Sequence, residues 1–150
     1  MSEKSIKAKH RQAVESRAQG CCEYCRSQAR FATQSFSIEH IQPLSRGGKS
    51  ELDNLALACQ GCNNHKYTKT EGLDPVSNDI VPLYNPRKQK WLDHFTWNDD
   101  YTLVIGLTTI GRATVEVLQL NRQGLVNLRR VLYAMGEHPP DNQLGIGVVD

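Results

Sequence analysis

The spacing of the cysteines in this chain indicates metal binding. Four of the five cysteines form two C-x-x-C pairs, Cys22 with Cys25 and Cys59 with Cys62. In a reducing compartment, paired thiols at this spacing are more often zinc ligands than disulfides. Each short turn brings two sulfurs to one ion, and four thiolates at about 2.3 Å complete a tetrahedron around Zn²⁺. We predict a structural zinc site at these four cysteines.

The fifth cysteine leaves a choice within the stretch "CCEYC". Either Cys21 or Cys22 offers a thiol there, but only Cys22 gives the spacing that matches Cys59 and Cys62. A redox-active C-x-x-C is the competing interpretation. It suits a single pair beside a βαβ unit and explains the second pair poorly.

A second set of ligand-type residues lies between and just after the pairs. Glu39 and His40 are adjacent, Asn54 follows, and Asn63 comes directly after the last cysteine of the second pair. If zinc joins the two pairs, the elements between them must pack together, which gathers these side chains. Oxygens from Glu39 and Asn63 form an incomplete ligand sphere for a hard divalent ion, with positions left for water and a phosphate. Such an open site is what metal-assisted catalysis requires.

The local sequence predicts the elements that hold these residues. Residues 5–19 are good helix formers ended by Gly20. Residues 31–41 are rich in β-branched and aromatic side chains and predict a strand. A loop containing Pro43 and two glycines follows, then a short strand leading to Cys59 and a helix from Gly61 to about Thr70. The predicted order is strand, long loop, strand, helix, clamped by zinc on both sides.

Beyond Gly72 the sequence changes character. Residues 74–89 contain three prolines and are expected to form a loop, and residues 95–108 predict a hairpin that turns at 98–100. Two helices are expected next, with Thr109 and Asn121 as N-caps. The second helix carries an apolar stripe that predicts a core face, formed by Leu125, Leu128, Leu132 and Met135.

The length and composition are compatible with one α+β domain. They exclude few classes of function. The chain has 150 residues, and 18 basic against 16 acidic side chains give a net charge of +2, too small to indicate a nucleic-acid partner. Residues 1–30 are locally basic, which fits an arm along a phosphate backbone or, more simply, a solvated helix face. No apolar run approaches the roughly 18 to 20 residues of a membrane span. No apolar segment follows the first lysines as in a signal peptide, so a cytoplasmic protein is expected.

The segment "CEYC…SIEHIQPLSRGGKSELDNLALACQGCNNHK" resembles the HNH endonuclease family over roughly residues 20–70. The resemblance implies a ββα-metal (His-Me finger) core. His40 matches the first histidine of the family pattern, Asn54 its asparagine, Asn63 its last histidine, and Glu39 an acidic position commonly held by aspartate. Asparagine in place of the last histidine is a harder oxygen ligand, which favours Mg²⁺ or Mn²⁺. Residues 82–138 are similar to the C-terminal part of a bacterial HNH subgroup.

The resemblance also implies a function. We expect a metal-dependent endonuclease that hydrolyses DNA and leaves 5′-phosphate and 3′-hydroxyl ends. His40, with an ordinary imidazole pKa near 6.5, is the expected general base, and Asn54 is the candidate that holds its other ring nitrogen through a side-chain or main-chain oxygen. Lys66 is expected to pair with a phosphate, and His65 is a second candidate contact to DNA.

The expected organisation has three parts: an HNH core with its N-terminal helix in residues 1–74, a C-terminal extension of a hairpin and helices packed on it in 75–138, and a loosely ordered tail in 139–150. A non-catalytic zinc-ribbon module that binds nucleic acid or a protein is the alternative function, with Glu39 and His40 incidental. The sequence carries no signal for a DNA recognition site or an oligomeric state.

Overall fold

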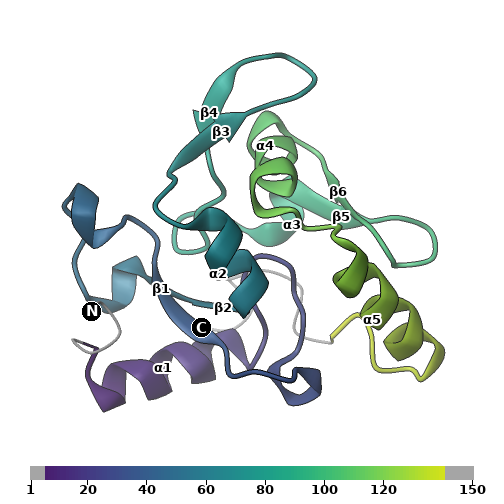
Figure 1. Cartoon of the computed structure of the whole chain (residues 1–150), viewed down its shortest axis with the longest axis horizontal. Helices are drawn as coiled ribbons and strands as arrows, with labels where there is room; N and C mark the ends of the chain where they lie inside the picture. Colours follow the sequence, from purple (N-terminus) through teal and green to yellow (C-terminus); the bar gives the residue numbers. More distant parts are fainter. Residues whose placement is uncertain (1–5, 141–150) are drawn as a thin grey trace.

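The structure is a computed structural model that describes residues 6–140. At its centre, β1 (Ser37–His40) pairs antiparallel with β2 (Leu55–Ala58), and Glu39 lies opposite Ala56. Helix α2 (Gln60–Lys66) follows β2 directly and lies against the hairpin (Figure 1). The predicted order of strand, long loop, strand and helix is therefore confirmed, in a mixed α+β fold.

Strand β1 is shorter than the predicted strand at 31–41. Residues Ala29–Phe31 form a 3₁₀ turn, and pairing begins only at Ser37. The reason is the partner: β2 is four apolar residues, all buried, and offers no longer edge for β1 to pair with. The β-rich composition of 31–36 was therefore not sufficient to make a strand there.

Helix α2 is capped and ended by specific residues. The Cys59 side chain is its N-cap and accepts a hydrogen bond from the Cys62 amide. Tyr67 has φ 50° and ψ −122°, a backbone conformation that cannot continue a right-handed helix. The helix accordingly ends at Lys66 and not near Thr70 as predicted.

Helix α1 (Ala8–Ala18) covers the outer side of β2. It ends as predicted at Gly20, where Gln19 and Gly20 both take positive φ. Near its C-terminal end, the Arg17 guanidinium donates to the carbonyls of Leu52 and Leu55. The helix is thus fastened to the segment that leads into β2.

The loop predicted for residues 74–89 is wrong at one point, because Ile80–Pro82 forms a strand that pairs with the residues just before the loop. Strand β3 (Glu71–Leu73) pairs with β4 (Ile80–Pro82), and the hairpin projects from the body of the molecule (Figure 1). Each strand has three residues, too few for an alternating pattern to stand out from the surrounding prolines. Asp74, in the turn between β3 and β4, accepts two hydrogen bonds from Arg112. Because Arg112 lies on the helix Thr109–Leu118, these bonds fix the hairpin to that helix.

The remaining elements are α3 (Trp91–His94), the hairpin β5 (Phe95–Trp97) with β6 (Val104–Gly106), α4 (Thr109–Leu118) and α5 (Gln123–Ala134). The hairpin confirms the prediction, but both predicted caps are wrong. Thr108 caps α4, accepting from the Gly111 amide at 3.0 Å. Asn121 precedes the N-cap of α5, and its side chain bonds both the amide and the carbonyl of Val104. The predicted stripe on α5 is half right: Leu125 and Leu132 are buried, whereas Met135 is exposed.

One apolar core runs through the hairpin β1–β2, the cysteine pairs and the C-terminal elements. Trp91 is almost fully buried, and its indole donates to the Tyr24 carbonyl at 2.9 Å. Arg87 forms an ion pair with buried Glu23. Residues after Leu73 thus pack on the core; the predicted tail lies mostly at 141–150, outside the described residues. No helix within residues 6–140 is long and apolar enough to span a membrane.

Candidate metal and nuclease site

The two cysteine pairs converge as predicted. The sulfurs of Cys22, Cys25, Cys59 and Cys62 all lie within 4.8 Å of one another, and all four side chains are buried. In residues 6–140 this is the one group of three or more His, Cys, Asp or Glu donors that converges in this way. Four buried sulfurs at this separation fit the tetrahedral thiolate sphere of a structural Zn²⁺.

The backbone of each pair supports bound sulfur. The Cys25 amide donates to Cys22 Sγ and the Cys62 amide donates to Cys59 Sγ, each at 3.5 Å. Ser27 Oγ lies 3.1 Å from Cys25 Sγ. Donors of this kind disperse negative charge on a thiolate. The cluster is thus prepared for anionic sulfur and holds β2 and α2 to the loop at residues 21–28.

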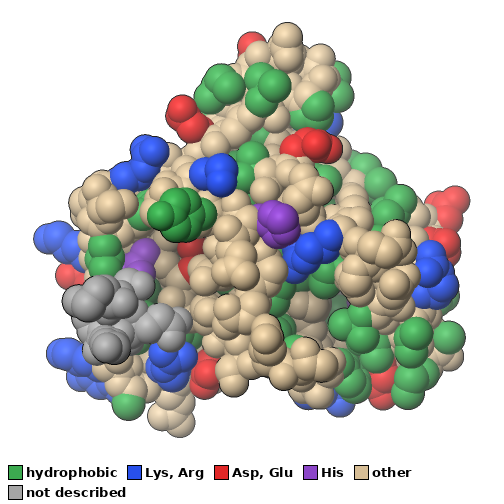
Figure 2. Space-filling view, viewed as in Figure 1, with side chains coloured by type: hydrophobic (Ala, Val, Ile, Leu, Met, Phe, Trp, Pro, Cys, Tyr) green, Lys and Arg blue, Asp and Glu red, His purple; other side chains and the backbone are tan. Residues whose placement is uncertain are grey.

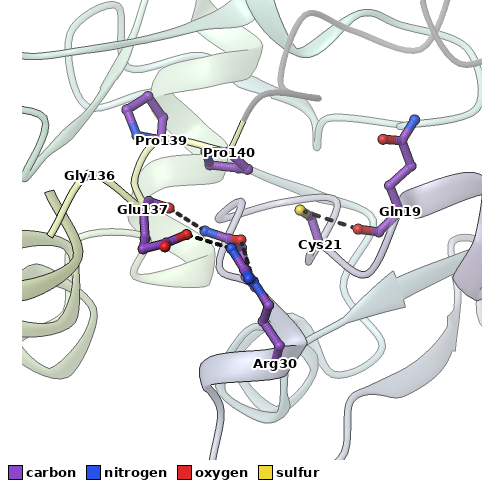
Figure 3. A pocket seen from close by; sticks show the side chains of 8 residues that line it. Gln19, Cys21, Arg30, Gly136, Glu137, Pro139 and Pro140 are labelled. Atoms are coloured by element: carbon purple, nitrogen blue, oxygen red, sulfur yellow. Dashed lines mark hydrogen bonds and ion pairs between the residues drawn. The ribbon is translucent and has the colours of Figure 1, made fainter.

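Cys21 lies outside this cluster, which supports the choice of Cys22. Its sulfur is directed to the Gln19 carbonyl at 3.8 Å, and it lines a separate pocket beside the ion pair of Arg30 with Glu137 (Figure 3). That pocket contains none of the predicted catalytic residues. The fifth cysteine therefore belongs to the packing between α1 and the segment after α5.

Glu39 is an interior residue. Only 5% of it is exposed; Oε1 lies 3.1 Å from Lys66 Nζ, and Oε2 accepts a hydrogen bond from the Tyr24 hydroxyl. Burial raises the pKa of the Glu39 carboxyl above its usual value, while Lys66 and Tyr24 oppose that shift. An ionised carboxylate offers about four acceptor positions. Both carboxylate oxygens of Glu39 are thus engaged by partners inside the protein.

Lys66 is buried, so it cannot make the contact with a phosphate that the sequence predicted. It is 2% exposed, and its ammonium group donates to the carbonyls of Ile41 at 2.9 Å and His40 at 3.4 Å as well as pairing with Glu39. A buried ammonium held by three oxygens cannot reach a DNA backbone. The sequence places lysine at the end of a short helix, but the direction of α2 turns it inward, toward the end of β1.

His40 is held by a residue that sequence reasoning missed. His40 Nε2 lies 2.8 Å from Ser50 Oγ. The ring is 7% exposed. Because side chains alternate along a strand, His40 and Glu39 project from opposite faces of β1. Ser50 is in the long loop between the strands, and only its closeness to the histidine in three dimensions distinguishes it from the other serines.

Asn54 organises the loop between β1 and β2. Its side chain accepts from the Gln42 amide at 2.8 Å and donates to the carbonyls of Gln42 at 3.0 Å and Lys49 at 2.9 Å. Its own carbonyl accepts from the Ile41 amide at 2.9 Å. These bonds fasten both ends of the loop that carries Ser50. Asn54 is thus placed to act on His40 through the loop backbone.

Asn63 and its neighbours lie on α2. Asn63 is half-buried and lies three residues before Lys66, so the two residues lie on the same face of the helix. His65 is exposed, as a contact to DNA requires. Tyr67, which the sequence did not single out, is 74% exposed and has a positive φ. Non-glycine residues in such conformations are enriched at functional sites.

Comparison with known proteins identifies the same segment. Residues 22–69 match a family model described as HNH endonuclease. This stretch contains the four clustered cysteines, the β1–β2 hairpin and α2. No curated protein and no protein of solved structure matches the chain.

Proposed function

Since residues 22–69 belong to the HNH endonuclease family, we propose that this protein is a metal-dependent endonuclease that hydrolyses DNA phosphodiester bonds. The observation that supports this most directly is the position of His40. It ends β1, lies 2.8 Å from Ser50 Oγ and shares a ββα unit with Glu39 and Asn63, closed by the cysteine cluster.

In this proposal His40 is the general base that takes a proton from the attacking water. A base of this kind needs its imidazole ring held in a fixed orientation toward the water. The contact from Nε2 to Ser50 holds the ring, and Asn54 keeps the loop of Ser50 in place. Ser50 and Asn54 are therefore positioning residues.

Glu39 and Asn63 would hold the catalytic ion, and their oxygen donors suit Mg²⁺ or Mn²⁺. A bound ion would supply positive charge that stabilises the phosphorane and the departing 3′-oxygen; addition of water to phosphorus with breakage of the P–O3′ bond, and protonation of that oxygen, gives 5′-phosphate and 3′-hydroxyl ends. Glu39 and His40 project from opposite faces of β1. The structure therefore does not bring these two side chains together in one small volume as the sequence predicted.

The DNA-facing surface in this proposal is the exposed end of α2. His65 and Lys69 are exposed there, and Tyr67 presents a ring that is 74% exposed. Lys and Arg side chains are spread over this face and do not gather into one patch (Figure 2). Affinity for DNA should accordingly be modest and salt-dependent, with Tyr67 adding an apolar contact to a sugar or base.

A plasmid cleavage assay tests the proposal. Zinc-loaded protein is incubated with supercoiled DNA and either Mg²⁺ or Mn²⁺, alongside the His40→Ala variant and a His10→Ala control on α1. The expected result is nicking or cutting by wild type and by the control, with His40→Ala at least about a hundredfold slower at unchanged fold and DNA affinity. Equal cleavage by wild type and His40→Ala would refute the role of His40.

A non-catalytic zinc module is the second candidate, and the buried ion pair of Glu39 with Lys66 favours it. In that case Glu39 is occupied by an internal cation and needs no divalent ion. Protein stripped with EDTA and reloaded with zinc alone separates the two functions. An enzyme regains cleavage only when Mg²⁺ or Mn²⁺ is then added, whereas a zinc module binds DNA without cutting it under any metal condition.

A further inference from the structure

Arg122 joins the C-terminal elements to the cysteine cluster through its guanidinium group. Nη2 donates to Cys59 Sγ at 3.2 Å, and Nη1 donates to Cys62 Sγ at 3.6 Å. Arg122 is the N-cap residue of α5, about sixty residues after the second cysteine pair. The contact therefore connects two distant parts of the sequence directly at the predicted zinc ligands.

The same guanidinium is tied to the end of α4. Nη1 also donates to the carbonyls of Gln119 at 3.0 Å and Leu118 at 3.2 Å. Carbonyls at the C-terminal end of a helix carry partial negative charge and bind cations. One planar group thus bridges the C-terminal end of α4 and the sulfurs of Cys59 and Cys62 at the start of α2.

The cradle around Arg122 is closed on the α2 side by Gly61. A Cβ added at Gly61 would lie 2.4 Å from Arg122 Nη2 and 2.6 Å from Cζ. Only a residue without a side chain lets the guanidinium approach the backbone between the two cysteines this closely. The glycine in "CQGC" thus serves a contact made by a residue far along the chain.

The positive charge of Arg122 would offset the negative charge of a metal-bound cysteine cluster. Zn²⁺ with four thiolates carries a formal charge of −2, and a buried group of that charge is costly without a nearby cation. A planar guanidinium with several donors suits two adjacent sulfurs. Without metal, the sulfurs of Cys59 and Cys62 are no longer fixed around one ion, so the guanidinium loses a rigid pair of acceptors.

We infer that Arg122 is a positioning residue for the cysteine cluster. Its contacts with the two sulfurs slow the loss of zinc. They also make the docking of α4 and α5 on α2 depend on bound metal. The inference goes beyond the proposed nuclease function and does not depend on it. Its consequence is that zinc removal loosens the C-terminal elements as well as the two cysteine pairs.

Zinc release tests the first half. The full chain is mixed with excess chelator, and the freed metal is followed by the absorbance of a zinc-binding dye. Arg122→Gln is expected to release zinc roughly tenfold faster than wild type, the size of effect typical of lost outer-sphere hydrogen bonds. Arg130→Gln, which changes an exposed arginine on α5, is the matched control and should release zinc at the wild-type rate. Equal rates for Arg122→Gln and Arg130→Gln would overturn the inference.

Two further measurements keep the test sharp if Arg122→Gln folds poorly. Arg122→Lys keeps the charge and loses the planar fork, so its zinc release should fall between wild type and Arg122→Gln. In Co²⁺-substituted protein, Arg122→Lys should shift the sulfur-to-metal charge-transfer bands, because the sulfurs lose a donor. Unshifted bands together with wild-type release would contradict the inference.

Amide hydrogen exchange tests the coupling. On zinc removal from wild type, protection should fall in residues 109–134 as well as around the cysteines. In zinc-loaded Arg122→Gln, residues 109–134 should already exchange faster than in wild type while the region around Cys22 stays protected. Full protection of α4 and α5 in zinc-free wild type would show that their docking does not depend on the metal.

Discussion

Lys66 Nζ lies 3.1 Å from Glu39 Oε1, with 2% and 3% of the two side chains exposed. The pair joins the end of α2 to the middle of β1 in the interior of the ββα unit. Lys66 also donates to the carbonyl oxygens of His40 and Ile41. One ammonium group therefore holds both the residue proposed to bind the ion and the backbone of the proposed base.

Replacing Lys66 by methionine should destabilise the protein by about 3 to 5 kcal/mol, because Glu39 would stay buried without its partner. The double variant Glu39→Gln/Lys66→Met should recover part of that loss, since a neutral amide still accepts from Tyr24. Urea unfolding of the two variants and wild type measures this. A Lys66→Met variant as stable as wild type would show that the pair contributes nothing to the fold. The stability comparison is also needed before any loss of cleavage in a Glu39 variant is assigned to the ion.

Replacing Ser50 by alanine should slow cleavage while the fold stays intact. One orienting hydrogen bond is worth roughly 1 kcal/mol, so kcat/KM should fall by about tenfold or less. The pH dependence of kcat/KM should move as well, because Ser50 contacts the nitrogen of His40 directly. Ser45→Ala, in the same loop and exposed, is the control. If Ser50→Ala and Ser45→Ala give the same rate and pH profile, Ser50 does not orient the base.

Replacing Asn54 by alanine should have a larger effect than its half-buried position suggests. The side chain makes three hydrogen bonds to the backbone of Gln42 and Lys49. Their loss should destabilise the protein by roughly 1 to 3 kcal/mol and loosen the loop at 42–54. Thermal unfolding and amide exchange measure the two effects. Unchanged exchange at residues 42–50 would mean that the loop is held by other contacts.

Replacing Cys59 by serine should unfold the zinc-bound region. The binding energy of structural zinc is largely folding energy, and Cys59 also caps α2. Circular dichroism melts of Cys59→Ser and of Cys21→Ser, whose thiol lies outside the cluster, compare the two kinds of cysteine. A cooperative Cys59→Ser melt at the wild-type temperature would argue against a zinc site that supports the fold.

Acid should loosen the β3–β4 hairpin through Asp74. Hydrogen bonds from Arg112 hold the pKa of the Asp74 carboxyl well below its usual value. A carboxyl whose pKa is lowered by folding stabilises the folded state at pH values above its ordinary pKa of about 3.9. That stabilisation is lost progressively as the pH falls below this value. Asp74→Asn should therefore lower the melting temperature clearly at pH 7 and less at pH 3. A difference that stays constant between these pH values would exclude the ionised carboxylate as the cause.

The sequence by itself determined the four-cysteine cluster and the order of the central elements. Both depend on short-range patterns: C-x-x-C turns direct two sulfurs to one point, and the apolar run before Cys59 becomes a strand because its four residues can all be buried. The hairpin at 95–106 follows from local alternation in the same way. The β3–β4 hairpin escaped prediction because three-residue strands carry too little pattern.

Only the tertiary structure decided what the side chains of the site touch. The direction in which α2 crosses β1 turns Lys66 inward to Glu39, and the path of a loop brings Ser50 to His40. The contact of Arg122 with Cys59 depends on how α5 begins beside α2. Contacts of this kind join residues that are far apart in the chain. Their geometry is set by the packing of whole elements and leaves no periodic signal in the sequence.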